Sequence, residues 1–271
     1  MGVALLFLLA TALGCLATLY WIPEDDLGRG YFQMNALVIL GLLALAGAIV
    51  VLHPVAPFRL APRLGGGSLA LALAAAFGYY GAMWLERWPL ARAAAAGATG
   101  ATAVALLVAG LGLTPAPTPL PHRPLLLAAA LLTSALLLGW SLVTMLLGHW
   151  YLVAPRLSFH HLTVFCRALL AMVGLRGAAV AVTVLAAASV GPAVEPHPLA
   201  LATGLAGEGM FFWFRVLWGL GIPLVLAAMA LHCARQRSNQ SATGILYVLV
   251  VGAFIGEITA LYLTVATGVP L

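Results

Sequence analysis

Eight apolar runs, each long enough to cross a membrane as a helix, follow one another along the 271 residues of this sequence. A helix needs about 20 mostly apolar residues to span the roughly 30 Å hydrocarbon core of a bilayer. Inside that core every backbone polar group must be satisfied within its own segment, so such runs fold as helices. We therefore predict an all-α fold, a polytopic integral membrane helix bundle. The expected spans cover residues 3–21, 31–52, 68–85, 93–113, 125–153, 161–190, 210–233 and 243–269.

The connections between these runs are short and rich in proline and glycine, which stop helices. They leave no room for a soluble domain, so residues 1–271 are expected to form a single transmembrane domain. The fourth run is the least certain span, because its start is rich in small residues and only mildly apolar, and the sequence alone is compatible with seven or eight spans. The longest loop, residues 191–209, is expected to carry a short interfacial helix.

Composition excludes several classes of protein. Only 7% of the residues are charged, against about 25% in an ordinary soluble domain. The net charge of +5 comes from arginines that are scattered along the loops, which argues against nucleic-acid binding. The three cysteines lie far apart and form no C-x-x-C pair. Zinc fingers, thiolate iron–sulfur clusters and covalently attached haem are therefore disfavoured.

The distribution of arginine predicts the orientation. With the N-terminus outside, the inner loops hold six arginines and the outer loops hold three: Arg29, Arg87, Arg92, Arg156, Arg235 and Arg237 against Arg59, Arg63 and Arg123. Cytoplasmic loops carry an excess of basic residues. We expect an integral protein of a bacterial inner membrane, in contact with the lipid bilayer, with both termini on the non-cytoplasmic side.

Three ionisable residues fall deep inside the predicted spans. Glu257 lies near the middle of the last span, Arg176 at a matching depth in the sixth, and Arg215 early in the seventh. Charged groups at membrane depth are costly and are usually paired or functional. We predict that Glu257 pairs with Arg176, or else with Arg215. The group is then either a proton or quinone site, or an ion pair that only holds helices together.

Four of the seven histidines gather at the inner side of the predicted topology. His149 and His232 end two spans at similar depth, and His160 and His161 open a third. Two histidines at matching depth on different helices are what axial ligation of a b-type haem requires, so His149 and His232 are candidate ligands of a haem iron. The alternative is that these are ordinary interfacial histidines, each with an apolar body and a polar tip.

The sixth span carries a second arginine, Arg167, which we include among the candidate cofactor-binding residues. Arg167 and Arg176 are nine positions apart, which sets them on opposite faces of a helix. We expect both to be buried, so that protein surrounds this helix on both sides and the helix lies either at the centre of the bundle or at a subunit interface.

The last two spans carry signals for close or irregular packing. Gly252 and Gly256 form a G-x-x-x-G pair that lets a neighbouring helix approach closely. Pro223 stands inside the seventh span and removes the hydrogen bond to the carbonyl of Gly219, so a kink is expected there. Such a kink either opens a cavity for a ligand or fits a curved neighbour.

Motifs of soluble catalytic domains are missing: there is no P-loop, no H-E-x-x-H, no G-x-S-x-G and no dinucleotide fingerprint. A stand-alone enzyme is therefore less consistent with the sequence than a non-catalytic anchor. In helix number and short loops the chain resembles the eight-helix membrane anchors of polysulfide- or dimethyl-sulfoxide-reductase-type complexes. That resemblance implies a membrane subunit of an electron-transfer complex that anchors redox partners and offers a quinone site, a haem b site, or both. The alternative is a small-solute or ion carrier, proton-coupled, that uses Arg176, Arg215 and Glu257.

Overall fold

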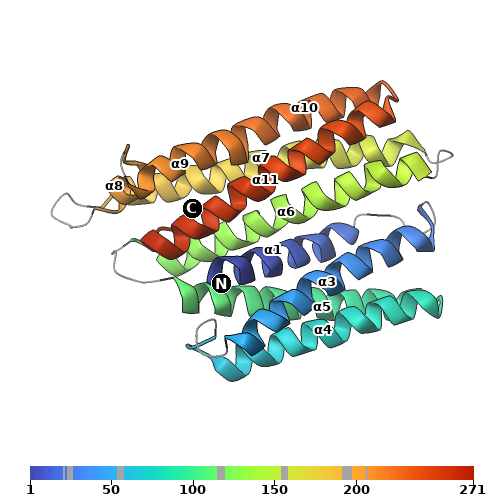
Figure 1. Cartoon of the computed structure of the whole chain (residues 1–271), viewed down its shortest axis with the longest axis horizontal. Helices are drawn as coiled ribbons and strands as arrows, with labels where there is room; N and C mark the ends of the chain where they lie inside the picture. Colours follow the sequence, from blue (N-terminus) through green and yellow to red (C-terminus); the bar gives the residue numbers. More distant parts are fainter. Residues whose placement is uncertain are drawn as a thin grey trace.

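A computed structural model describes residues 1–20, 22, 27–53, 58–114, 120–153, 158–190, 197–205 and 207–271. Within these ranges the chain is helical and contains no strand. Eight helical segments are long and apolar enough to cross a membrane, including the fourth, which the sequence left open. The predicted helix bundle is therefore confirmed (Figure 1). Arg156 and the acidic residues 24–26 lie outside the described ranges.

The first half of the chain supplies four of the eight spanning helices in the described ranges. α4 and α5 form a tightly packed hairpin, and α1 packs against both α3 and α5. The bounds are α1 (Gly2–Leu19), α3 (Arg29–Leu52), α4 (Pro62–Trp84) and α5 (Trp88–Leu113). Proline occupies one of the first two positions of α4 and of α5, where the missing N–H is not needed.

The second half supplies the other four spans. Its helices are α6 (Arg123–Val153), α7 (Phe159–Ala188), the short α8 (Pro198–Thr203), then α9 (Glu208–Val216), η1 (Leu217–Gly221) and α10 (Ile222–Arg235), and finally α11 (Asn239–Thr267). α9, η1 and α10 follow without interruption and make one spanning helix. α8 is the short helix predicted in the loop that precedes this span.

Two helices occupy the centre of the bundle and join its halves. In the apolar windows of α1 and α6, 67% of the residues are buried, against 28% in α7. α1 and α6 cross at Gly14 and Gly139, where a Cβ on either glycine would overlap the backbone of the other helix. α7 instead packs against α6 and α10 at the edge of the bundle. The expected place at the centre of the bundle is therefore wrong for α7, and a subunit interface along its exposed side stays a prediction.

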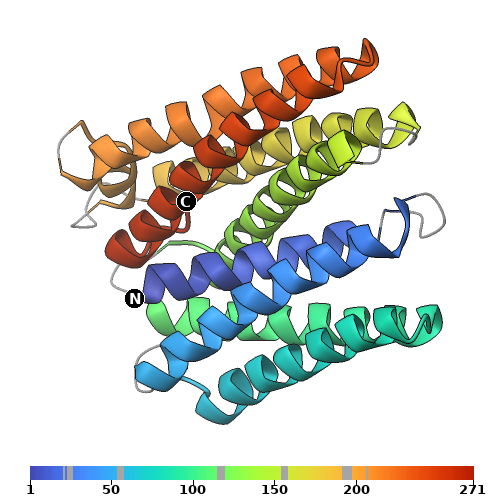
Figure 2. The same ribbon diagram turned by 45° about the vertical axis from the view of Figure 1, so that its right-hand side comes forward.

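The two ends of the bundle differ in charge. Residues 1 and 271 lie near the same end, which we call the terminal end (Figures 1 and 2). At the opposite end, which we call the arginine-rich end, the chain connects α1 to α3, α4 to α5, α6 to α7 and α10 to α11. The described arginines of the arginine-rich end are Arg29, Arg87, Arg92, Arg235 and Arg237, whereas Arg59, Arg63 and Arg123 belong to the terminal end.

Helix η1 is a π-helix, a wider turn in which the N–H of Ile222 donates to the carbonyl of Leu217. It ends two residues before Pro223, which has no N–H to donate to the carbonyl of Gly219. The predicted irregularity is thus present at the expected place, in the form of a π turn rather than a break. Single π turns inside α-helices often occur at functional sites.

Candidate functional site

The structure brings Arg176, Arg215 and Glu257 together in the interior of the second half of the bundle. Arg176 comes from α7, Arg215 from α9 and Glu257 from α11. All three side chains are buried, with exposed fractions of 1%, 0% and 0%. They lie in the half of the bundle nearer the terminal end. We call these three residues the charged centre.

Glu257 is the shared acceptor of the charged centre. Arg176 donates through Nε to both carboxylate oxygens, at 3.0 and 3.1 Å, and through Nη2 to Oε2 at 2.9 Å. Arg215 donates through Nη2 to Oε1 at 3.3 Å. A guanidinium that meets a carboxylate through two nitrogens forms a strong and directional pair. The geometry therefore ranks Arg176 as the main partner and Arg215 as the second.

A fourth partner comes from the last residues of the described chain. Gly268 ends α11 in the left-handed conformation, and the chain turns back so that the Leu271 N–H donates to Thr264 Oγ1 at 3.1 Å. The main-chain oxygen of Leu271 then accepts from Arg176 Nη2 at 2.8 Å. This contact was not predicted, because nothing in a Gly-Val-Pro-Leu sequence indicates that its backbone meets an arginine of another helix.

Close packing of glycines sets the position of Arg215 relative to Glu257. A Cβ on Gly256 would overlap the Cα of Gly219, and one on Gly219 would lie 2.7 Å from the Cα of Gly256. The small residues let η1 and α11 approach until their backbones touch. The G-x-x-x-G signal in α11 thus indicated a close approach correctly, and its partner is the π turn next to Arg215.

The charged centre holds more hydrogen-bond donors than its acceptors use. Among the described residues, the buried atoms without a hydrogen-bond partner include Arg176 Nη1 and Arg215 Nε and Nη1. The three charged side chains carry two positive charges and one negative charge. Buried donors without partners each cost about 1–3 kcal/mol. The centre is therefore suited to a further acceptor, such as an oxygen of a ligand.

An apolar cavity of about 430 Å³ lies beside the charged centre. Its walls come from α7, α8, α9 and η1, and they include Gly177 and Val216, the chain neighbours of Arg176 and Arg215. The three charged residues themselves are not part of its lining. We call it the α7–α9 cavity. Small-molecule sites are mostly lined by apolar and aromatic side chains of this kind.

The histidines predicted as haem ligands take other partners. His149 Nδ1 lies 3.0 Å from the hydroxyl of Tyr247 on α11, and His232 Nε2 lies 3.0 Å from Gln236 Nε2 one turn along α10. Both histidines are exposed. α6, which carries His149, packs against α1, α7 and α11, whereas α10, which carries His232, packs against α7 and α11.

His160 and His161 begin α7, with ring centres 5.8 Å apart. Nowhere in the described ranges do three or more His, Cys, Asp or Glu side chains gather as a metal site. These histidines lie near the helix ends at the arginine-rich end, as predicted, but α6 and α10 pack mainly against other helices rather than against each other in the described part of the chain. Haem ligation by His149 and His232 stays a prediction.

Arg167 differs from the prediction that it is buried. Its side chain is exposed, whereas Arg176 on the opposite face of α7 is buried. Arg167 lies in the part of α7 nearer the arginine-rich end, where a long arginine side chain can extend toward the polar interface. Arg167 therefore does not belong to the charged centre.

No known protein family, curated protein sequence or solved structure matches this chain. The resemblance to reductase membrane anchors thus rests on helix number and loop length alone. What the site does must be inferred from its own geometry.

Proposed function

We propose that this chain is the membrane subunit of an electron-transfer complex and that it binds a quinone, with the charged centre at the polar end of the site. The observation that carries the proposal is the combination of unpartnered buried guanidinium donors with an apolar cavity beside them. A quinone has carbonyl oxygens that accept hydrogen bonds and an apolar tail that suits apolar walls. The π turn of η1 contributes Leu220 to the cavity and packs through Gly219 on Gly256, the chain neighbour of Glu257.

The charges of the centre fit this chemistry. Reduction of a quinone to a quinol consumes two electrons and two protons, and negative charge develops on the carbonyl oxygens. Donors fixed in advance in a dry site stabilise such charge more strongly than water does. Arg215 would supply those donors, because two of its nitrogens have no partner, while Glu257 holds its third nitrogen in position.

The electrons would come from soluble redox subunits that dock on the membrane protein. The short loops leave the chain little surface for chemistry of its own outside the membrane. We propose a location in a bacterial inner membrane, with the arginine-rich end facing the cytoplasm. Haem b between His149 and His232 is a further proposal, and it requires α6 and α10 to present these side chains to a common space.

Purification in mild detergent tests this proposal. We expect redox subunits to accompany the chain, and quinone to be recovered from the preparation by solvent extraction. A visible spectrum of the same sample reports on haem through its Soret band and its reduced α-band. A chain that is active, colourless, free of quinone and without partners would contradict the proposal.

A small-solute or ion carrier is the second candidate function. The observation that favours it is a helix irregularity next to a buried charge, since carriers use discontinuous helices at their binding sites. Uptake of a labelled anion by sealed proteoliposomes containing only this chain would support the carrier. The quinone site does not predict such uptake.

A further inference from the structure

The short helix α8 forms the wall of the α7–α9 cavity at the terminal end of the bundle. Leu199 and Thr203 of α8 line the cavity, which reaches inward as far as Gly177 of α7 and Leu220 of η1. Figure 1 shows α8 at the terminal end, beside the start of α9. A displacement of α8 would therefore open the cavity toward the terminal end.

Hydrogen bonds hold α8 in place at both of its ends. At its start, the main-chain N–H of Leu199 donates to Nδ1 of His197 at 3.3 Å, and Nε2 of His197 lies 3.1 Å from the carbonyl oxygen of Val190. At its other end, the indole N–H of Trp213 on α9 donates to the carbonyl oxygen of Thr203 at 3.1 Å. A helix of six residues is not stable by itself, so its order depends on contacts of this kind.

The two partners of His197 fix the charge of its ring. A main-chain N–H only donates, so Nδ1 accepts and carries no proton. A carbonyl oxygen only accepts, so Nε2 carries the proton and donates to Val190. The neutral imidazole has one donor and one acceptor nitrogen, whereas both nitrogens of the charged form are donors. The cap on α8 therefore requires a neutral His197.

A second proton on the ring would break this cap. It would turn Nδ1 into a donor that faces the N–H of Leu199, and two donors form no hydrogen bond. Histidine ordinarily changes its charge between about pH 5 and 8. The cap is complete above this range and is lost as the pH falls through it, because a displaced α8 leaves the ring free to take up the proton that the capped form excludes.

Other ionisable groups lie at the terminal end of the elements around α8. α9 begins with Glu208, whose Oε1 accepts from the hydroxyl of Tyr262 on α11 at 3.0 Å. His122 and Arg123 lie at the start of α6, and the last two turns of α7 contain no ionisable residue. Glu195 belongs to the preceding loop, outside the described residues. Because several of these groups also titrate, the variants below separate their effect from that of the capping histidine.

We propose that α8 is a pH-dependent cover of the α7–α9 cavity, closed while His197 is neutral and loosened when His197 is protonated. The proposal concerns the regulation of the quinone site, and it rests on the proposed function only in taking this cavity as the ligand site. Loosening of α8 withdraws Leu199 and Thr203 from the cavity wall. An acidic medium at the terminal end thus speeds the exchange of the ligand.

Hydrogen exchange of α8, followed by mass spectrometry on the purified full chain without ligand, tests the proposal. Exchange rates at pH 7.5 and 5.5 are corrected for the chemical exchange rate of an unprotected amide. We expect the opening of residues 199–204 to increase about fivefold at pH 5.5, the usual contribution of one N-cap. His197→Asn should keep exchange slow at both pH values, because asparagine caps a helix without titrating, and His197→Ala should make it fast at both.

His122→Asn is the matched control. His122 is an exposed histidine at the same end of the bundle, and asparagine tolerates its left-handed backbone, with φ at 53°. This variant should keep the pH dependence of the parent chain. Equal exchange at the two pH values in the parent, a pH dependence that survives in His197→Asn, or one that is lost in His122→Asn would overturn the proposal.

Binding of a short-chain quinone separates this proposal from the proposed function. If both hold, the quinone should associate and dissociate about fivefold faster at pH 5.5 than at pH 7.5, the same factor as one N-cap, and His197→Asn should remove the difference. Exchange that depends on pH without any quinone binding would support the cover and reject the quinone. Saturable quinone binding with exchange that is independent of pH would reject the cover alone.

Discussion

Replacing Glu257 by glutamine is expected to destabilise the protein more than replacing either arginine of the charged centre. Glu257 is the only acidic side chain in contact with the two guanidinium groups among the described residues. Removing it leaves two positive charges buried at once, whereas removing one arginine leaves Glu257 with the other. Breaking a buried ion pair from one side costs about 3–5 kcal/mol, and we expect Glu257→Gln at the upper end of this range.

The two arginines should differ, because the structure gives them unequal contacts. Arg176→Met removes three hydrogen bonds to Glu257 and one to Leu271, and a loss of about 3 kcal/mol is expected. Arg215→Met removes one bond of 3.3 Å. It also removes two buried nitrogens that had no partner. The stability lost with the hydrogen bond is largely offset, because an unsatisfied buried donor destabilises the protein by about as much as a hydrogen bond to a charged group stabilises it. The net loss in the free energy of unfolding should therefore be roughly 1 kcal/mol or less.

Combined variants separate charge pairing from packing. Combining Glu257→Gln with Arg176→Met should recover part of the stability lost in Glu257→Gln, because it removes one of the two buried charges left without a partner. Adding Arg215→Met should recover more. The free energy of unfolding is measured by denaturant titration in mixed micelles, with Arg167→Met as the control for an exposed arginine on the same helix. Arg215→Met as costly as Arg176→Met, or a double variant no better than its worse parent, would refute this reasoning.

Three further predictions concern packing, topology and the histidines. Gly256→Val should lower the thermal midpoint of unfolding sharply, because the valine side chain would overlap Gly219. Gly244→Val is the control and should be tolerated, because nothing lies within 4 Å of a Cβ at that position. Equal midpoints in the two variants would mean that this contact is not present. A reporter active only in the cytoplasm, fused after the last residue, should stay silent; activity would reverse the proposed orientation. His149→Ala should abolish any haem spectrum, whereas His122→Ala should leave it intact. A haem spectrum that is unchanged in both variants would return His149 to an interfacial role.

The fold could be predicted from the sequence because membrane insertion depends on local composition. Apolar length determines each span, and prolines and glycines mark its ends. α5 formed a span in spite of its alanine-rich first half, since its apolar window still has a mean hydropathy of 1.8. The pairing of Arg176 with Glu257 was predictable because depth along the helices limits which charges can meet.

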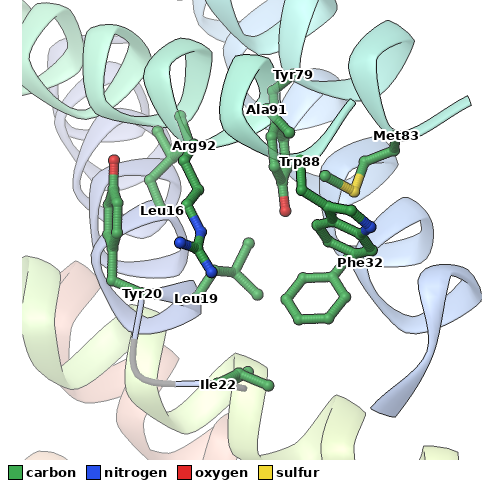
Figure 3. Close-up of a pocket in the computed structure, with 11 residues that line it drawn as sticks. Leu16, Leu19, Tyr20, Ile22, Phe32, Tyr79, Met83, Trp88, Ala91 and Arg92 are labelled. Atoms are coloured by element: carbon green, nitrogen blue, oxygen red, sulfur yellow. The ribbon is translucent and has the colours of Figure 1, made fainter. Parts of the chain in front are cut away.

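Contacts that depend on helix neighbours could not be predicted. His149 and His232 lie at similar depth, yet α6 and α10 each pack against α7 and α11 rather than against each other. Helical periodicity placed Arg167 and Arg176 on opposite faces, but it does not tell which face meets protein. The pocket that Tyr20, Phe32 and Trp88 line (Figure 3) could not be predicted for the same reason, because these residues lie far apart in the sequence and only the fold brings them together.

The central claim is that a quinone occupies the α7–α9 cavity, and quenching of tryptophan fluorescence tests it most directly. Trp213 lines that cavity, whereas Trp218, at a similar exposure on the same spanning helix, does not. The purified chain is titrated with a short-chain quinone in detergent. We predict saturable quenching that is lost in Trp213→Phe, is retained in Trp218→Phe, and is weakened in Arg215→Gln. Quenching that rises linearly without saturation, or that is lost equally in both tryptophan variants, would contradict the claim.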